Sequence, residues 1–268
     1  MKKTVIFALL SLLVLSGCTT SQDKEDKVIK VGASPTPHSL ILEVAKAEVE
    51  KLGYTLEIVE FTDYILPNTA LDAGDLDANY FQHVPYLTKF NSEKGTKLSS
   101  VLAVHFEPLG LYPGKSVDLD GLKAGGATVA IPNDPTNEAR ALRLLADNGY
   151  ITLKGAADAN VTPLDIDQNP YNLQFVEMEA ALLAQTLVDV NFAIINGNYA
   201  LGANIADSVL LTEDKDSIAA QTFANIIVVQ TGKENSEKTK ILIQALTSGA
   251  VKKFIEETFY PTVISVLE

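Results

Sequence analysis

The sequence lacks a second cysteine, an excess of positive charge and any long apolar run beyond its first residues. Because Cys18 is the only cysteine among 268 residues, no disulfide can form within the chain. The 21 lysines and arginines are outnumbered by 34 aspartates and glutamates, and the resulting net charge of −13 repels phosphate backbones. Beyond residue 15, no apolar run approaches the roughly 20 residues that a membrane-spanning helix needs. We therefore expect neither an internal disulfide nor a nucleic-acid partner.

The sequence also lacks the short motifs of common enzymes and metal sites. Only three histidines are present, His38, His83 and His105, and none has the H-E-x-x-H spacing or a similar metal-ligand arrangement. A G-x-S-x-G nucleophile turn, a phosphate-binding P-loop and a G-x-G-x-x-G dinucleotide motif are all missing. We therefore expect a protein with no catalytic activity, metal or cofactor. An enzyme without a known motif stays an alternative.

The N-terminus has the pattern of a secretory signal. Two lysines near the start are followed by an apolar run over residues 4–15, and then by Ser16, Gly17 and Cys18. A short positive segment, an apolar segment too short to span a bilayer and a pair of small residues are the parts of a signal peptide. The closing letters L-S-G-C also resemble the bacterial lipobox, in which the cysteine receives a diacylglycerol and becomes the first residue after cleavage.

This pattern predicts where the mature protein works. Residues 1–17 are predicted to be the signal peptide, and residues 18–27 the lipidated Cys18 with a polar tether. Because two or more acyl chains hold a protein stably at a bilayer, the mature chain is predicted to lie outside the cytoplasm, anchored to the cell membrane. The alternative is a plain signal peptide, or a short anchor helix, with Cys18 at this place by chance.

From residue 28 onward, strand-like and helix-like segments alternate. Helical spacing of apolar residues, with glycine or proline at the ends, predicts helices over residues 39–52, 135–148 and 236–259, the last broken by Gly249. Short β-branched or alternating runs predict strands over residues 28–33, 54–61, 78–81, 101–106, 128–131, 191–195 and 225–229. Such alternation indicates an α/β protein with parallel sheets covered by helices.

The alternating segments fall into two blocks. Residues 28–110 together with 222–268 are predicted to form one lobe, and residues 114–220 the other. Two chain crossings between the lobes would let them close on a ligand by a hinge motion. Clefts between domains, near the carboxyl ends of strands, are the usual ligand sites. The pattern therefore favours a binding protein with a cleft between its lobes.

Several segments at predicted strand ends are rich in polar and aromatic residues, and they resemble a known family. These segments read VAIPNDPTNEARALRLL, AIINGNYA, DANYFQHVPYL, FTDYILPN and FANI. They are similar to segments of the NlpA family of lipoproteins, which includes the methionine-binding (MetQ-type) receptors of ABC importers. The resemblance covers nearly the whole mature chain. It implies a type II periplasmic-binding-protein fold that closes over a free amino acid.

Four polar residues are candidates for binding the charged groups of that ligand. Arg140 suits the carboxylate because a guanidinium binds carboxylates through two parallel hydrogen bonds. The alternative is a surface arginine that pairs with Glu138 or Asp134. Amide side chains offer both donors and acceptors, which suits a site for an ammonium and a carboxylate. The amide candidates are Asn137, Asn196 and Asn225.

Two of these asparagines have a structural alternative. Asn196 stands beside Gly197, where asparagine is common in turns. Asn137, with Thr136, could instead cap the helix that begins near Pro135.

An aromatic group is predicted to bind the ligand's side chain. Sulfur–aromatic contacts are favourable by about 0.3–1.5 kcal/mol each, so aromatic rings suit a thioether. The candidates are Tyr64, Phe81, His83 and Tyr86. The resemblance implies that the Q-H-x-P segment, which contains His83, faces the cleft. Core packing is the alternative for Phe81 and a structural hydrogen bond the alternative for His83, and His105 is expected to be structural or near the hinge.

Taken together, these features predict a solute-binding lipoprotein that captures L-methionine and delivers it to an ABC permease with a cytoplasmic ATPase. One alternative is the same receptor with D-methionine, a methionine derivative or another small apolar amino acid as its ligand, because a pocket distinguishes a methylene or two by only about 1–3 kcal/mol. A surface adhesin built on the same fold is another.

Overall fold

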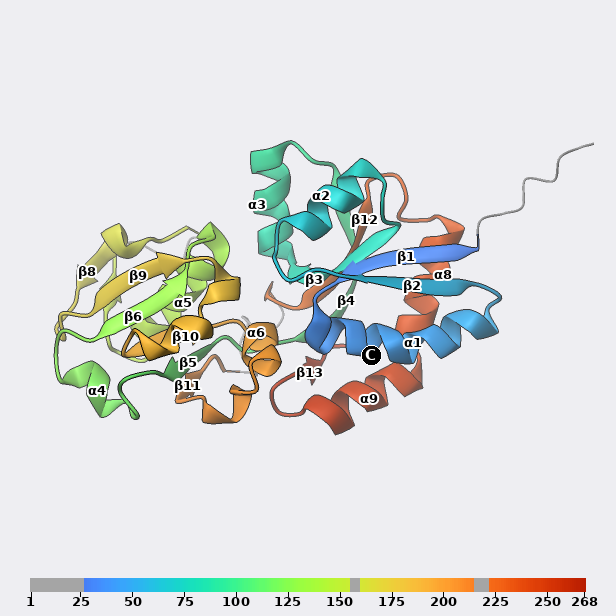
Figure 1. The fold of residues 1–268 in the computed structure, drawn as a ribbon. Coiled ribbons are helices and arrows are strands. Elements are labelled where there is room, and N and C mark those ends of the chain that lie inside the picture. Colours follow the sequence, from blue (N-terminus) through green and yellow to red (C-terminus); the bar gives the residue numbers. More distant parts are fainter. Residues whose placement is uncertain (1–26, 155–159, 215–221) are drawn as a thin grey trace, which may run out of the picture.

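The computed structural model describes residues 27–154, 160–214 and 222–268. The predicted signal peptide (residues 1–17), the lipidation site Cys18 and all of the predicted tether except Lys27 lie outside the described residues. Among the described helices, none is both long enough and apolar enough to cross a membrane. The described elements form two lobes, each built on its own sheet (Figure 1). The predicted two-lobed α/β fold is therefore confirmed.

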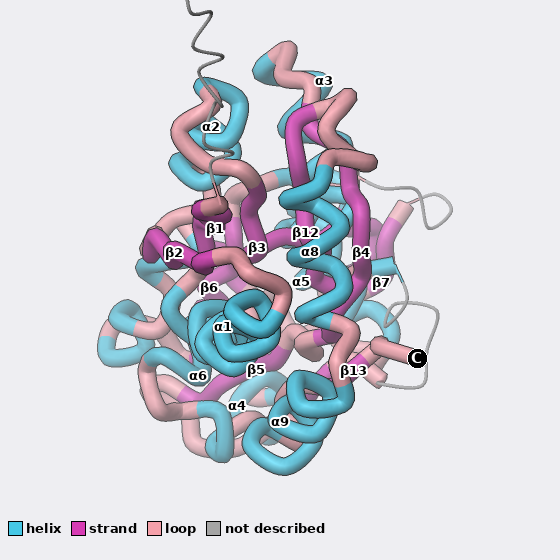
Figure 2. Tube along the Cα trace, turned by 90° about the vertical axis from the view of Figure 1, so that its right-hand side faces the viewer, coloured by secondary structure: helices cyan, strands magenta, loops and turns pink. Residues whose placement is uncertain are grey.

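The first lobe is built on a mixed sheet with helices on both faces. In spatial order its strands are β13 (Ile264–Ser265), β4 (Leu98–Phe106), β12 (Asn225–Gln230), β3 (Ala78–His83), β1 (Val28–Ala33) and β2 (Thr55–Glu60). One face is covered by α1 (Leu40–Lys51), α8 (Glu237–Leu246) and α9 (Gly249–Phe259), and the other by α2 (Leu66–Ala73) and α3 (Val84–Lys94). Figure 2 shows α2 above the strands and α1 and α9 below them.

The position of β12 inside the first sheet explains why the sequence of this strand is continuously apolar. Ile227 and Val229 pack into the core under α1 and α8, whereas Ile226 and Val228 pack against α2 and α3. Successive side chains of a strand point to opposite faces, so a strand covered on both faces must be apolar at every position. All four side chains are almost completely buried.

The second lobe repeats this arrangement on a smaller scale. Its five-stranded sheet has the order β11 (Leu211–Thr212), β5 (Gly110–Pro113), β10 (Phe192–Ile195), β6 (Thr128–Pro132) and β9 (Gln174–Met178). Helices α4 (Asp120–Lys123), α5 (Pro135–Asp147) and α6 (Gly197–Gly202) and a separate hairpin of β7 (Thr152–Leu153) and β8 (Ile166–Gln168) complete the described part. Short 3-10 turns occur at Pro163–Asp165, Ala180–Leu182, Gln185–Val188 and Ala206–Ser208. Alternate residues of β10 enter two separate cores, Phe192 and Ile194 on the α5 side and Ala193 and Ile195 on the other.

Both sheets contain antiparallel pairs beside the predicted parallel ones, and the crossings between the lobes explain why. Strand β4 leaves the first sheet toward the second lobe, and β12 enters the first sheet on the way back, so these neighbours are antiparallel. Strand β12 is antiparallel to β3 for the same reason, while β1 pairs in parallel with both β2 and β3. In the second sheet β10 is antiparallel to β5 and parallel to β6.

Some element ends also differ from the prediction. Strand β3 continues to His83 and β4 begins at Leu98, so both are longer than their apolar runs. The predicted helix over residues 236–259 is two helices, and the second begins with Ser248, whose side chain accepts a hydrogen bond from the Val251 backbone N–H. Gly249 is thus the first residue of α9, because the break comes from the Ser248 cap. The residue bounds of the two lobes stay a prediction.

Candidate ligand-binding cleft

A small cavity lies between the two lobes, where β3, β4, β6 and β10 end and β12 begins. The structure brings all eight predicted binding residues to its wall, namely Tyr64, Phe81, His83, Tyr86, Asn137, Arg140, Asn196 and Asn225. Sequence reasoning missed four further lining residues, which are Gln82, Glu107, Gly197 and Asn198. Their proximity indicates one site, and the part each plays in binding stays a prediction.

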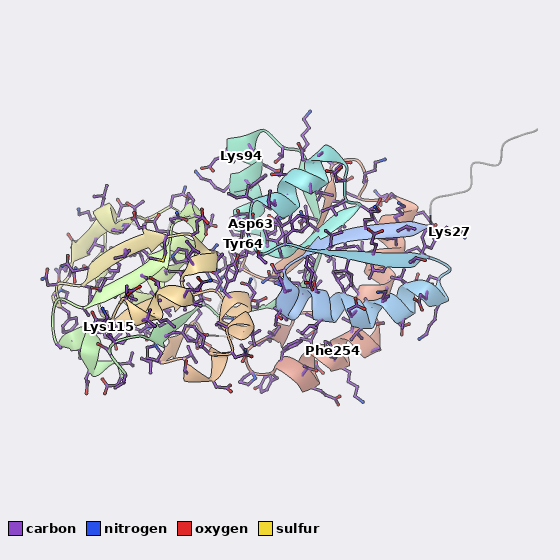
Figure 3. All side chains as sticks on the ribbon, viewed as in Figure 1. Lys27, Asp63, Tyr64, Lys94, Lys115 and Phe254 are labelled. Carbon is purple, nitrogen blue, oxygen red and sulfur yellow. The ribbon has the colours of Figure 1, made fainter. Side chains whose placement is uncertain are left out.

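Three aromatic rings of the first lobe form one side of the cavity. The ring centroids of Tyr64, Phe81 and Tyr86 lie 5.8–6.0 Å apart, within the range for favourable aromatic pairs. The Tyr86 hydroxyl donates to the Tyr64 backbone carbonyl at 2.8 Å, which fixes two of the rings relative to each other. The Tyr64 hydroxyl donates across the cleft to Asn198 Oδ1 at 2.5 Å. Figure 3 shows Tyr64 where the two lobes meet.

His83 joins the aromatic side to the polar side. It is the last residue of β3 and the N-cap of α3, and its Nδ1 accepts from the Tyr86 backbone N–H at 3.2 Å. Because Nδ1 accepts, the proton of the neutral ring sits on Nε2, which donates to Asn137 Oδ1 at 3.2 Å. Burial and the nearby Arg140 lower the pKa of His83 to about 3, so the ring is neutral at physiological pH.

The first turn of α5 holds Asn137 in a fixed orientation. Asp134 is the cap of this helix, since its carboxylate accepts from the Asn137 backbone N–H at 3.0 Å and from Thr136 Oγ1 at 2.9 Å. The alternative of a cap formed by Asn137 and Thr136 is therefore wrong. Asn137 Nδ2 also donates to Asp134, at 2.9 and 3.0 Å, so Oδ1 is left to accept from His83 and from Asn196 Nδ2 at 3.0 Å.

Asn196 has a free acceptor in this wall. It comes directly after β10, at the start of α6, and its side chain makes no capping bond. Because its Nδ2 donates to Asn137, its Oδ1 is the remaining polar atom. That oxygen is buried and has no hydrogen-bond partner among the described residues. Buried polar atoms are nearly always paired, so an orphan in a cavity wall indicates a group that the ligand supplies.

Arg140 is buried, with 4% of its surface exposed, and its main partner is one that the sequence did not reveal. Its Nε and Nη2 donate to the two carboxylate oxygens of Glu213 at 2.6 and 2.5 Å, and Nη2 also donates to the Glu107 backbone carbonyl at 2.8 Å. The guanidinium lies 4.5 Å from the ring centroid of Phe223. Pairing with Glu138 or Asp134 is therefore not how Arg140 is held. A ligand carboxylate can reach this guanidinium only through Nη1 unless Glu213 moves.

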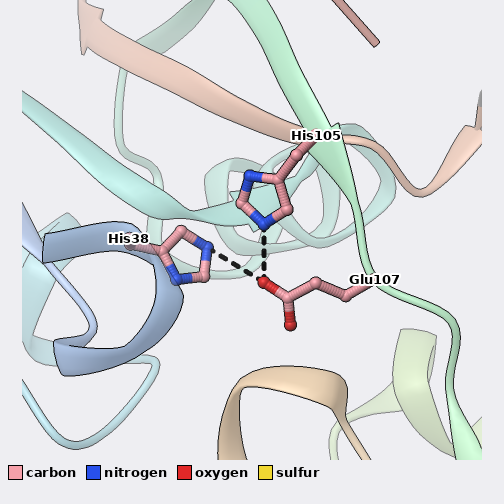
Figure 4. A group of neighbouring side chains, drawn as sticks. All are labelled: His38, His105 and Glu107. Atoms are coloured by element: carbon pink, nitrogen blue, oxygen red, sulfur yellow. Dashed lines mark hydrogen bonds and ion pairs between the residues drawn. The ribbon is translucent and has the colours of Figure 1, made fainter. Parts of the chain in front are cut away.

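Behind the cavity, two histidines surround the carboxylate of Glu107 (Figure 4). Glu107 comes directly after β4, in the first crossing between the lobes, and is 5% exposed. Its Oε1 lies 2.6 Å from His105 Nε2 and 3.5 Å from His38 Nε2. His105 Nδ1 is hydrogen-bonded to the Tyr80 hydroxyl, and His38 Nε2 lies 3.0 Å from Asn225 Oδ1. His105 is thus structural and close to the crossing, as predicted.

The titration of this cluster follows from its burial. Burial lowers the pKa of His38 to about 4 and that of His105 to about 3, so both rings are neutral near pH 7. Burial raises the pKa of Glu107 above its ordinary value, against the opposing pull of His38 and of the Asn198 backbone N–H that donates to it. Each ring then donates through Nε2, from His105 to Glu107 and from His38 to Asn225.

The same three side chains could geometrically hold a metal ion, since one ligand atom of each lies within 4.8 Å of the others. The 2.6 Å spacing between His105 Nε2 and Glu107 Oε1 indicates a hydrogen bond instead. Two ligands about 2.0–2.2 Å from a tetrahedral zinc ion are separated by more than about 3 Å.

Comparisons with known proteins agree with this fold. The family model described as NlpA lipoprotein matches residues 29–267. A D-methionine-binding lipoprotein MetQ from Salmonella typhi is 42% identical over 94% of this chain and 93% of its own length. A lipoprotein structure from Ruminococcus gnavus is 50% identical, with a TM-score of 0.87 over 89% of this chain and 99% of that one.

A solved nutrient-binding protein from Burkholderia cenocepacia, bound to methionine, is 40% identical and has a TM-score of 0.83. It covers 89% of this chain, and this chain covers 99% of it. The family match spans both lobes and the cleft between them. This chain therefore belongs to the NlpA lipoprotein family.

Proposed function

We propose that this chain is the solute-binding lipoprotein of an ABC importer and that its ligand is methionine. The observation that carries the proposal is the composition of the cavity, in which three aromatic rings of one lobe lie opposite buried amide and charged groups of the other. A thioether side chain suits the aromatic side, and an ammonium and a carboxylate suit the polar side. Related proteins that are named as methionine-binding, or were solved with methionine, support this ligand.

Hydrogen bonds that cross the cleft support capture by closure of the lobes. The crossing bonds join Tyr64 to Asn198, His83 to Asn137 and Tyr199 to the Thr62 backbone carbonyl. Each of them must break when the lobes separate, so they stabilise the closed form in which a ligand is enclosed. A receptor that encloses its ligand in this way can release it when a permease separates the lobes.

We propose the L-enantiomer as the ligand, and the names of the related MetQ proteins make D-methionine the second candidate. The enantiomers are distinguished by measuring both with the same protein. The chain from residue 19 onward should be unfolded, freed of any retained ligand and refolded, because a closed cleft can retain ligand through purification. A competition series with L-methionine, D-methionine, leucine and norleucine should then rank L-methionine first. Equal or better binding of leucine would refute methionine as the ligand.

We further propose that Cys18 carries the lipid anchor and that the binding lobes lie outside the cytoplasm. The L-S-G-C segment and the membership of a lipoprotein family support this. The full-length chain, expressed in bacteria with labelled palmitate, should carry the label and sediment with membranes. A Cys18→Ser variant should lose both properties, and a labelled, membrane-bound variant would contradict the proposed site.

A further inference from the structure

We propose that Glu213 is a positioning residue that binds Arg140 to both crossings between the lobes, so that the guanidinium keeps one direction and only its Nη1 faces the ligand. This inference rests on the proposed function and adds a residue that the ligand does not touch. Glu213 comes directly after β11, at the start of the second crossing, and lies outside the cavity wall that the described residues form. It belongs to none of the segments that carry the family resemblance.

The first step is the contact between Glu213 and Arg140. Nε donates to Oε1 at 2.6 Å and Nη2 donates to Oε2 at 2.5 Å, so two parallel hydrogen bonds hold one edge of the planar guanidinium. The side chains of Arg140 and Glu213 are 4% and 9% exposed, so water competes little for either partner. The guanidinium cannot turn in its plane without breaking both bonds. Glu213 therefore sets the direction of Nη1, the corner that is left for the ligand.

The second step is the attachment of Glu213 itself to the first crossing. The Leu109 backbone N–H donates to Glu213 Oε2 at 2.8 Å, and the Glu213 backbone N–H donates to the Leu109 carbonyl at 3.1 Å. Strands β11 and β5 pair in antiparallel fashion directly beside this point. Backbone and side chain of Glu213 are thus fixed together, and the carboxylate cannot follow a guanidinium that moves away.

The third step is the contact of Arg140 with the first-lobe side of both crossings. Its Nη2 donates to the Glu107 backbone carbonyl at 2.8 Å, directly after β4. Its guanidinium carbon lies 4.5 Å from the ring centroid of Phe223, two residues before β12, and 5.6 Å from that of Phe106 at the end of β4. Both distances are within the range of a cation–π contact. Arg140 is on α5 of the second lobe, so separation of the lobes changes these contacts while the bonds to Glu213 remain.

Glu213 supports Arg140 from behind and does not take the place of the ligand. A side chain that imitated the ligand's carboxylate would lie in the cavity wall, and among the described residues this wall contains Arg140 without Glu213. A buried guanidinium with no anionic partner carries an uncompensated charge whenever the cleft is empty. Glu213 removes this cost before a ligand arrives, so the cleft is preorganised for a carboxylate.

The first test measures the contact in the wild type. Arg140 and Arg143 are the only arginines of the chain, so labelling with ¹⁵N-arginine gives two Nε–H signals, which an Arg143→Lys variant assigns. Arg143 is part-buried and serves as the internal reference. In the ligand-free chain from residue 19 onward, the Nε–H of Arg140 should exchange with solvent at least about 100-fold more slowly than that of Arg143. Equal exchange of the two would overturn the proposal.

The second test measures what the contact does for the ligand. Methionine and methioninamide, which lacks the carboxylate charge, are titrated at about pH 6, where both amines are protonated. The wild type and the control Asp207→Asn, at an exposed acid of the same lobe, should prefer methionine by at least about 10-fold. Glu213→Gln offers a donor where Arg140 needs an acceptor, so it should weaken methionine binding by about 10- to 100-fold and methioninamide binding by no more than about threefold. Glu213→Asp, which keeps the carboxylate, should recover part of the preference.

The outcomes separate this inference from the proposed function. If the wild type binds no methionine, the proposed function is overturned, and the arginine exchange still decides whether Glu213 holds Arg140. If Glu213→Gln binds methionine as tightly as the wild type or more tightly, Glu213 competes with the ligand and its positioning role is overturned. Equal weakening of both compounds would mean a purely structural role and would also overturn it. If Glu213→Gln fails to fold, the exchange in the wild type and the preference of Glu213→Asp decide.

Discussion

Replacing Gly197 with alanine should damage the cleft specifically, and the same helix offers a matched control. Helix α6 begins with Gly197 and ends with Gly202. A Cβ at position 197 would lie 2.8 Å from Glu107 Cβ, closer than non-bonded carbon atoms come, whereas a Cβ at position 202 meets nothing within 4 Å. Overpacking of this kind costs about 1–3 kcal/mol. In a helix, alanine is otherwise more favourable than glycine by up to about 1 kcal/mol.

The two variants should therefore differ in stability by about 1–3 kcal/mol, with Gly197→Ala the less stable. For a chain of this size each kcal/mol corresponds to about 2–4 °C in Tm, so thermal unfolding followed by circular dichroism resolves the difference. Methionine affinity should fall in Gly197→Ala, because Glu107 is displaced, and stay unchanged in Gly202→Ala. If both variants matched the wild type in Tm and in affinity, the close packing of Glu107 against α6 would be refuted.

Three further predictions concern buried groups of the cleft. Because burial lowers the pKa values of the three histidines to about 3–4, the unfolded chain takes up protons below pH 6.5 that the folded chain does not. The free energy of unfolding, measured with urea, should then fall by about 1–3 kcal/mol per pH unit from pH 6.5 toward pH 4, the raised pKa of Glu107 offsetting part of the loss. Tyr64→Phe removes the hydroxyl that donates to Asn198 across the cleft, so methionine should dissociate about 2- to 10-fold faster in stopped-flow measurements. Arg140→Ala should abolish methionine binding and, by leaving the part-buried Glu213 carboxylate with only its hydrogen bond from the Leu109 backbone N–H, lower the unfolding free energy by about 3 kcal/mol.

Different results would contradict each of these predictions. Stability that stays constant from pH 6.5 to pH 4 would mean that the histidines are already charged in the folded chain. An unchanged dissociation rate in Tyr64→Phe would mean that this bond does not hold the lobes together. Arg140→Ala with wild-type affinity would exclude Arg140 from carboxylate binding, and Arg140→Ala with wild-type stability would make the pair with Glu213 unimportant.

The sequence predicted the cleft better than it predicted the contacts inside it. Asn196 and Asn225 adjoin apolar strands, and the strand pattern together with the family resemblance placed them at one site. The partner of Arg140, in contrast, could not be predicted from the sequence. Glu213 is 73 residues away in the chain, in a segment without a motif, so only the fold could bring the two together. Short-range pairing with Glu138 or Asp134 was the alternative that sequence proximity offered.

Glu107 is a cleft residue that the sequence could have indicated. It is an acidic residue directly after a strand that ends in buried Val104, His105 and Phe106, and a charge in that place is costly unless it has a partner. That position was a usable signal for a cleft residue. The orphan oxygen of Asn196 left no such signal, because it results from amide orientations that three separate elements determine. The antiparallel course of β12 likewise depended on the return crossing between the lobes, which no local pattern encodes.

The measurement that tests the central claim most directly is a calorimetric titration of L-methionine into the unfolded and refolded chain from residue 19 onward. A methionine receptor should bind one equivalent with a Kd in the micromolar range or tighter, which corresponds to about −8 kcal/mol or better. Absence of any binding heat, from protein shown by circular dichroism to be folded, and again at a second temperature, would contradict methionine as the ligand of this cleft.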